Sequence, residues 1–404
     1  MEECYENSSC YGPGGLCPVR VGDLLGPDPP RYRVAAKLGW GSYATVWLAR
    51  DIVGSKTVAL KIVEAASSQG STEAAILGRL RAPPSVEPLV LQLFDAFTVT
   101  SPNGVHQVLV TEPVMLLQDY LSLPGRRMTT RALMRQVVEG VAFMHARGIA
   151  HGGESPTNIG VALPEPDAFS EIKLWKRIGA PDVIPLLASD PTRDPASFPP
   201  YICEALDLTE FVRQWVPDFA TRSPPRARIL DLGSAYAVDD SPPPPCGCPL
   251  LFRPPEVIFQ QLLDRANSGP WDCRSDIWSL ACLLYEIATG GCLFGGSMGA
   301  SLNDSHLKRL ARASGSLPDA WAKHLSISAT QYTSELADEF WKEREISDKT
   351  IEDGLGLLQL LRRMLVIDPA RRPTAEEVLR DPYFDGLQDP GVGVELDPAF
   401  TRYS

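Results

Sequence analysis

Two polar side chains in apolar stretches of the chain could bind phosphate and a divalent metal ion. Lys61 lies in the run VALKIV, where an ammonium group is costly unless it meets an anion. Asp231 ends the apolar part of RILDLG, and a carboxylate in such a turn can ligate Mg²⁺. A pair between Lys61 and Glu73, at the head of EAAILGRL, would direct the ammonium group toward phosphate oxygens. Each residue alone also fits a plainer interpretation, an edge lysine that reaches water and a turn aspartate.

Two further segments could take part in the same chemistry. The segment GIAHGGESPTNIG, residues 148–160, supplies the imidazole of His151 and the amide oxygen of Asn158. Upstream, Gly39 and Gly41 in LGWGSYATVW would let the backbone approach phosphate oxygens closely. Glycines between two strands also form ordinary hairpins, so this signal is weak by itself.

Composition limits the classes of protein and partner. The chain has 404 residues, 44% of them hydrophobic, and a net charge of −12, which indicates a globular protein and argues against direct nucleic-acid binding. The acidic surface could attract a basic protein, although solubility is the favoured explanation of the charge. Nine cysteines without a CxxC pair favour reduced thiols in an intracellular compartment. Neither a secretory signal nor a membrane-spanning stretch is expected.

The first part of the chain predicts a small sheet. Alternating apolar and polar residues predict strands at 32–38, 44–50 and 57–63, and two more in LVLQLFDAFTV and HQVLVTE. The segment STEAAILGRLRAP predicts a short helix that proline ends. Residues 31–112 are therefore expected to form a five-stranded sheet with one helix, after an extended lead-in at 1–30.

The second part is predicted to be mostly helical. Apolar periodicity predicts helices in TTRALMRQVVEGVAFMHARG, EDGLGLLQLLRRMLV and TAEEVLRDPYF, and residues 275–290 predict a buried helix. Proline-rich residues 163–228 interrupt this pattern as a long insert, and 389–404 form a tail. A buried pair between Glu256 and Arg372 would stabilise the helical part.

The order of these features resembles the protein kinase superfamily. A glycine loop, a strand lysine, a helix glutamate, a His/Asn loop, Asp-Leu-Gly, Pro-Glu, Asp-Ile-Trp-Ser and a late arginine follow one another as in its signature set. The stretches CPVRVGDLL and RYRVAAKLGWGSYATVWLARD resemble the SR-protein kinases, including fungal-like members. That family also has a proline-rich spacer at the position of 163–228, and the resemblance covers about residues 17–388.

The resemblance implies an α+β, bilobal protein-kinase-like fold. It implies an N-terminal lobe with a small antiparallel sheet at 31–112 and a larger, mainly helical C-terminal lobe at 113–388. ATP and Mg²⁺ are the implied cofactors, with Asn158 and Asp231 as metal ligands and the backbone around Pro113 at the adenine. The implied nucleotide-binding residues are Leu38, Gly39, Gly41, Val46, Ala59, Lys61, Glu73, Glu112 and Val114.

The implied catalytic loop departs from the family pattern. The family reads HxDxKPxN, and this chain reads HGGESPTN, so Gly153 replaces the aspartate that accepts the substrate proton and Ser155 replaces the lysine. The candidate catalytic positions are His151, Gly153 and Glu154. Impaired transfer, as in a pseudokinase, is the favoured hypothesis. One alternative is an active Ser/Thr kinase, with Glu154 as a substitute or with positioning and Mg²⁺ alone. The other is a scaffold that binds no nucleotide.

The resemblance also implies a partner and a mode of regulation. A basic, Arg/Ser-rich protein or peptide is the implied partner, and a cytoplasmic or nuclear monomer is expected. Ser241 is the only hydroxyl residue between Tyr236 and Phe252, so switching by phosphorylation of a long activation loop is not expected.

Overall fold

The chain folds into two compact units, which are described separately. The first comprises Met1–Arg81, Leu91–Gly125 and Val161–Ser223, and the second comprises Ala82–Val90, Arg126–Gly160 and Pro224–Ser404. The computed structural model describes residues 5–83, 86–123, 130–153, 155–163, 176, 179–188, 192–215, 225–239, 243–264, 269–295, 304–344, 346 and 353–387. The domain boundaries expected from the sequence stay predictions.

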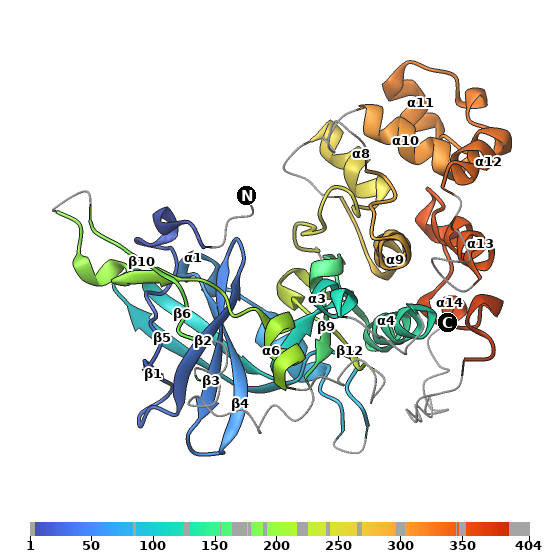
Figure 1. Cartoon of the computed structure of the whole chain (residues 1–404). Helices are drawn as coiled ribbons and strands as arrows, with labels where there is room; N and C mark the ends of the chain where they lie inside the picture. Colours follow the sequence, from blue (N-terminus) through green and yellow to red (C-terminus); the bar gives the residue numbers. More distant parts are fainter. Residues whose placement is uncertain are drawn as a thin grey trace. The chain divides into compact units, whose positions relative to one another are not determined.

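A six-stranded antiparallel sheet forms the centre of the first unit (Figure 1). Its strands, in spatial order, are β1 (Leu24–Leu25), β2 (Tyr32–Trp40), β3 (Ala44–Asp51), β4 (Lys56–Val63), β6 (Gly104–Thr111) and β5 (Leu93–Ser101). The five predicted strands are present, but the count of five was wrong. The sequence did not reveal β1 because two residues are too few to show a period. Val34, Leu60 and Val110 are fully buried in the core of this sheet.

Short helices follow the strands of the first unit. The predicted short helix is α2 (Glu73–Arg79), and α1 (Ala65–Ser68) precedes it as an additional turn. After β6, the chain forms β7 (Val114–Leu116) and α3 (Leu117–Ser122), whose Leu117 and Tyr120 are buried. These elements give the first unit the α+β character that the sequence predicted.

The N-terminal lead-in is part of the core of the first unit rather than a plain extended segment. It contains the short turn η1 (Ser8–Cys10), and its Leu16, Cys17 and Val19 are buried. Glu6 pairs with the fully buried Lys37 of β2 and accepts a hydrogen bond from Tyr11 at 2.7 Å. The sequence predicted an extended lead-in but did not indicate these buried contacts, because glycine and proline separate its scattered apolar residues.

The described part of the spacer, like the lead-in, contains secondary structure. It contains β10 (Val183–Pro185), which pairs antiparallel with β11 (Tyr201–Cys203), then η4 (Pro195–Ser197) and α6 (Leu208–Trp215). Asn103 connects the N-terminal lead-in to the spacer. Its Nδ2 donates to the carbonyl of Leu16 in the lead-in and to that of Ser197 in the spacer, each at 2.7 Å. Other parts of the spacer at 163–228 lie outside the described residues.

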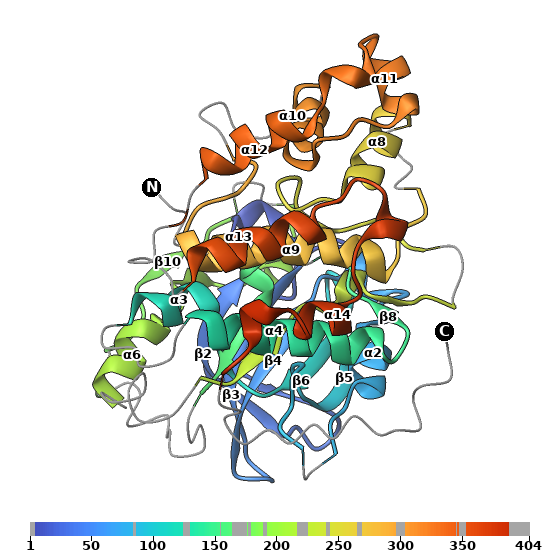
Figure 2. The same ribbon diagram turned by 90° about the vertical axis from the view of Figure 1, so that its right-hand side faces the viewer.

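The second unit is mainly helical (Figure 2). Its helices are α4 (Thr130–His145), α8 (Pro255–Leu263), α9 (Cys273–Thr289), α10 (Asp304–Ser314), α11 (Asp319–Leu325), α12 (Ser334–Lys342), α13 (Gly354–Met364) and α14 (Ala375–Leu379). The remaining described elements are four short strands and five short turns. The strands are β8 (Ile149–Ala150), β9 (Ile159–Ala162), β12 (Ala227–Ile229) and β13 (Tyr236–Ala237). The turns are η2 (Pro156–Asn158), η5 (Leu232–Ser234), η6 (Ala329–Gln331), η7 (Pro369–Arg371) and η8 (Pro382–Phe384). The helix α9 is buried as predicted and packs against α4 and α13. None of the described helices is long and apolar enough to cross a membrane.

An ion pair between the buried Arg372 and the half-buried Glu256 joins α8 to the segment before α14, so the predicted pair is present. The guanidinium of Arg372 donates to both carboxylate oxygens of Glu256, at 2.9 and 2.6 Å. The Arg372 side chain is fully buried and also donates to the carbonyls of Val366, Ile367 and Arg274. The arginine therefore links its own loop, which includes Val366 and Ile367, to α8 and to the start of α9.

Candidate functional site

Lys61 and Glu73 form a close ion pair in the first unit. Lys61 lies on β4, an interior strand between β3 and β6, so the interpretation as an edge lysine is excluded. Its Nζ lies 2.8 Å from each carboxylate oxygen of Glu73, the first residue of α2. The Glu73 side chain is 4% exposed and that of Lys61 is 22% exposed. The carboxylate therefore fixes the direction of the lysine while leaving its tip in contact with solvent.

The glycine turn between β2 and β3 leaves open space above its backbone. Neither Gly39 nor Gly41 has a positive φ, so their own backbone does not require glycine. A Cβ atom added at either residue would meet no described atom within 4 Å. This space suits a ligand that approaches the backbone N–H groups closely, as phosphate oxygens do.

Apolar side chains lie on the same face of the sheet as Lys61. Alternation along β4 places Ala59 and Lys61 on one face, and the register places Val46 of β3 opposite Lys61. Val46 and Leu38, just before the glycine turn, are half-buried, whereas Ala59 is buried. The face that carries the lysine therefore also offers an apolar surface of the kind that an adenine ring contacts.

The predicted hinge is tied down by the side chain of Glu112. Its carboxylate accepts a hydrogen bond from the Gln92 amide at 3.0 Å, and its own amide donates back to the Gln92 carbonyl at 3.3 Å. Val114, beyond Pro113, begins β7 and is half-buried. Because the Glu112 carboxylate is already hydrogen-bonded to Gln92, the backbone groups of the predicted hinge are the groups suited to ligand recognition.

In the second unit, the buried carboxylate of Asp276 holds the His/Asn loop. Asp276 lies in the first turn of α9 and is 2% exposed. It accepts hydrogen bonds from the amides of His151 and Gly152 at 2.8 and 2.9 Å, and its Oδ2 lies 3.0 Å from Nε2 of His145. Sequence reasoning did not assign His145 any role, because a partner 131 residues away leaves no local pattern.

His151 has a positioning role within this loop. Its Nδ1 accepts a hydrogen bond from the Gly153 amide at 3.1 Å, and its Nε2 lies 3.0 Å from the Leu230 carbonyl. With Nδ1 accepting, Nε2 carries the proton and donates to that carbonyl. The residue is 1% exposed, and its ring supports the loop backbone. The catalytic position expected at His151 stays a prediction.

Asn158 is oriented by the residue that replaces the missing acid. Its Nδ2 donates to the Gly153 carbonyl at 2.7 Å, which leaves Oδ1 as the atom suited to a metal ion. The Asn158 carbonyl accepts from the Leu230 amide at 2.8 Å, so the residue before Asp231 is held directly against Asn158. Asp231 itself is exposed and has a left-handed backbone with φ 55°, an uncommon conformation for a residue other than glycine that is found often at functional sites.

Asn158 and Asp231 suit a metal ion whose other ligands come from a bound molecule. Asn158 and Asp231 offer one amide and one carboxylate group, and no cluster of three His, Cys, Asp or Glu residues suited to a metal occurs in the part of the chain that the structure describes. Mg²⁺ is often held by one or two protein groups together with phosphate oxygens. Metal binding here would therefore depend on a nucleotide.

The position of the missing aspartate has room for a side chain. A Cβ atom at Gly153 would lie 3.5 Å from His151 Nδ1 and 3.7 Å from Asn158 Nδ2, which are ordinary contact distances. Ser155, at the position of the family's lysine, is 3% exposed and its Oγ lies 2.8 Å from the Thr157 hydroxyl. Glu154, the candidate substitute, lies outside the described residues. Steric crowding therefore does not account for the absence of an acid at Gly153.

The neighbouring Gly152, in contrast, is enclosed. It has φ 67°, and a Cβ atom there would lie 2.1 Å from the indole ring of Trp271. Trp271 donates from Nε1 to the Pro244 carbonyl at 2.8 Å, and the thiol of Cys246 lies 3.6 Å from the Gly152 carbonyl. The segment after Asp-Leu-Gly thus packs on the loop through neutral groups, whereas Ser241 lies outside the described residues.

Comparisons with known proteins agree with this geometry. The family model described as protein kinase domain matches residues 32–175 and 220–384. The serine/threonine-protein kinase SRPK of Physarum polycephalum is 28% identical, over 94% of this chain and 91% of that protein. The protein kinase dsk1 of Schizosaccharomyces pombe is 24% identical, over 98% and 87%. The pig SRSF protein kinase 3 is 33% identical, but over 45% of this chain and 34% of that protein.

A solved structure supports the fold. The crystal structure of a kinase domain matches with a TM-score of 0.56 and 19% identity, over 91% of this chain and 98% of that one. The chain therefore belongs to the protein kinase domain family and, within it, is of the SR-protein-kinase type. The predicted fold class, an antiparallel sheet lobe with a mainly helical second lobe, is confirmed.

Proposed function

We propose that this protein binds ATP with Mg²⁺ and a basic, Arg/Ser-rich partner, and that it transfers phosphate slowly or not at all. The observation that carries the proposal is the hydrogen bond from Asn158 Nδ2 to the Gly153 carbonyl at 2.7 Å. It keeps the amide that would bind Mg²⁺ in place beside Gly153, which brings no acid. The protein would act by binding, as a pseudokinase.

Each unit, taken separately, offers groups suited to nucleotide binding. Lys61, held by Glu73, would contact the α- and β-phosphates, and the backbone at Gly39 and Gly41 would contact phosphate oxygens. Oδ1 of Asn158 and the carboxylate of Asp231 would hold Mg²⁺, which neutralises phosphate charge when bound. Leu38, Val46 and Ala59 would contact the adenine ring, with backbone groups of Glu112 and Val114 forming hydrogen bonds to its edge.

Phosphate transfer lacks two groups that the family uses. No carboxylate is present at Gly153 to position the substrate hydroxyl and accept its proton, a contribution of about 10²- to 10⁴-fold in rate. The Ser155 hydroxyl is neutral, buried and engaged with Thr157, so it cannot neutralise the γ-phosphate as a lysine would. Positioning and Mg²⁺ would then sustain no more than a slow reaction.

The partner follows from the relatives and the net charge. Relatives named SRSF protein kinases and a net charge of −12 favour a basic, Arg/Ser-rich protein. A monomer that occupies the cytoplasm or the nucleus fits this partner. A scaffold without nucleotide binding is less well supported, since the Lys61–Glu73 pair and the open glycine turn would then serve no ligand.

Nucleotide binding is tested by thermal unfolding with and without Mg·ATP. We expect the wild-type protein to gain about 2.7 kcal/mol of stability at an ATP concentration of about 100 times Kd, and the gain to fall when Mg²⁺ is removed. Lys61→Met and Asp231→Asn are expected to lose most of this gain. Lys56→Met, at the exposed start of the same strand, is the matched control and should keep it. Equal gains in Lys61→Met and Lys56→Met, or no gain in the wild type, would contradict the proposal.

A further inference from the structure

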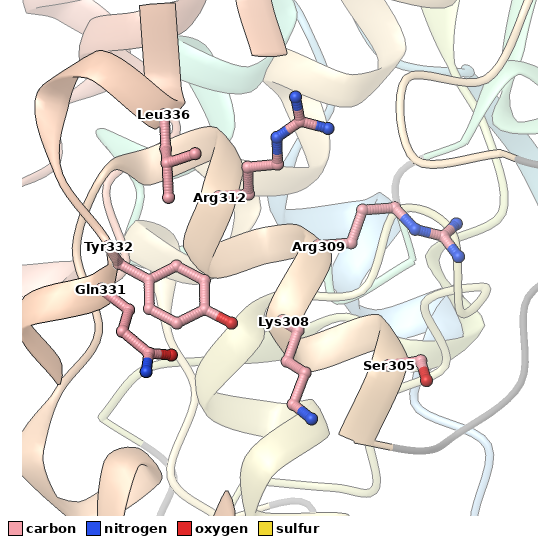
Figure 3. Close-up of a pocket in the computed structure, with 7 residues that line it drawn as sticks. All are labelled: Ser305, Lys308, Arg309, Arg312, Gln331, Tyr332 and Leu336. Atoms are coloured by element: carbon pink, nitrogen blue, oxygen red, sulfur yellow. The ribbon is translucent and has the colours of Figure 1, made fainter. Parts of the chain in front are cut away.

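A pocket of about 360 Å³ lies in the second unit, on α10 and the segment that follows α11. Figure 3 shows three basic side chains that project from α10, opposite residues of η6 and α12. The residues that line the pocket are Ser305, Lys308, Arg309, Arg312, Gln331, Tyr332 and Leu336. The lining contains three cations and no carboxylate, although the whole chain carries a net charge of −12.

Two of the three cations carry charge that no described carboxylate balances. Arg312 is neutralised, because it lies 2.9 Å from the Glu343 carboxylate and 3.9 Å from that of Glu339. Arg309 donates to a neutral group, the Phe294 carbonyl, and the exposed Lys308 has no ion-pair partner among the described residues. Lys308 and Arg309 therefore form a local positive rim on an acidic protein.

The other side of the pocket is apolar with a few hydrogen-bonding groups. Leu336 and the ring of Tyr332 are half-buried and face the aliphatic parts of the α10 side chains (Figure 3). Burial raises the pKa of the Tyr332 hydroxyl, so it stays protonated and can donate a hydrogen bond. The exposed Gln331 and Ser305 add an amide and a hydroxyl. The pocket thus combines an apolar surface with cations at its edge.

We propose that this pocket binds a short acidic segment of a partner protein, with one apolar side chain against Tyr332 and Leu336 and carboxylates at Lys308 and Arg309. A small inorganic anion would leave the apolar surface unused. A nucleic acid would meet long-range repulsion from the net charge of −12, whereas a short acidic peptide places its charge at the cationic rim alone. This site is separate from the nucleotide proposal, because none of its lining residues belongs to the predicted nucleotide or metal positions.

Binding is measured by fluorescence anisotropy with the full chain and a labelled peptide Asp-Asp-Asp-Leu-Asp-Asp-Asp. The paired variant Lys308→Glu with Arg309→Glu is expected to raise Kd at least about tenfold, and added salt is expected to raise Kd for the wild type. Lys342→Glu, an exposed lysine of α12 outside the pocket lining, is the matched control and should stay within about twofold of the wild type.

Two peptide controls separate charge from shape. Replacing the leucine by serine, or every aspartate by asparagine, is expected to weaken binding several-fold. If the paired variant melts early, Lys308→Glu alone, at an exposed position, supplies the comparison. The proposal is overturned if the wild type does not bind the peptide, if the α10 variants bind as tightly as Lys342→Glu, or if the serine peptide binds as tightly as the leucine peptide.

Discussion

Replacing Gly153 by aspartate is expected to raise the rate of phosphate transfer to an Arg/Ser peptide by about 10²- to 10⁴-fold. The added carboxylate would restore a group that positions the substrate hydroxyl and accepts its proton. The loop can accept it, because the Cβ position at Gly153 lies 3.5 Å or more from every described neighbour and needs no positive φ. The measurement is incorporation of radiolabel from ATP, with Mg²⁺ present.

The matched control is Gly153→Asn, which has nearly the same shape as aspartate but cannot accept a proton. It should leave the rate near that of the wild type, and both variants should unfold at similar temperatures. If the wild type already transfers phosphate as fast as Gly153→Asp, the impaired-transfer proposal fails and an active kinase with another proton acceptor is the better description. Glu154→Gln would then be the next variant to assay.

Replacing Arg372 by methionine is expected to destabilise the protein by about 3 to 5 kcal/mol, the usual penalty for removing one partner of a buried ion pair. Glu256 would lose two hydrogen bonds, and the carbonyls of Val366, Ile367 and Arg274 would lose their donors. Urea unfolding followed by circular dichroism measures the change. A fall of roughly 10 °C in melting temperature should accompany it.

A surface ion pair provides the control for this prediction. Arg380, the residue after α14, pairs with Glu376 at 3.3 Å, with side chains 69% and 47% exposed. Arg380→Met should therefore cost about 1 kcal/mol or less. Adding Glu256→Leu to Arg372→Met should recover part of the lost stability, because the half-buried carboxylate would no longer be left without its arginine. Similar losses in Arg372→Met and Arg380→Met would show that the buried pair has no special role.

The sheet and the main helices were predictable because their signals are local. Apolar alternation located β2, β3, β4, β5 and β6, apolar periodicity located α4, α13 and α14, and an apolar stretch without a polar face located α9. The role of the N-terminal lead-in was not predictable, since its burial depends on Asn103 and on spacer residues far along the chain. The positive pocket on α10 was equally hidden, because Tyr332 and Leu336 reach it from another segment.

The sequence by itself determined which chemical groups the loop HGGESPTN contains. It showed that Gly153 brings no acid, that Ser155 brings no cation, and that Asn158 and Asp231 keep the oxygens that suit a metal ion. Only the tertiary structure decided how these groups are directed. Asp276 and Leu230, remote in sequence, hold the loop so that Asn158 Nδ2 meets the Gly153 carbonyl, and Trp271 closes Gly152 while Gly153 keeps room for a side chain. The orientation of these groups depends on contacts between segments that are distant in the sequence, and such contacts produce no periodic pattern of residues.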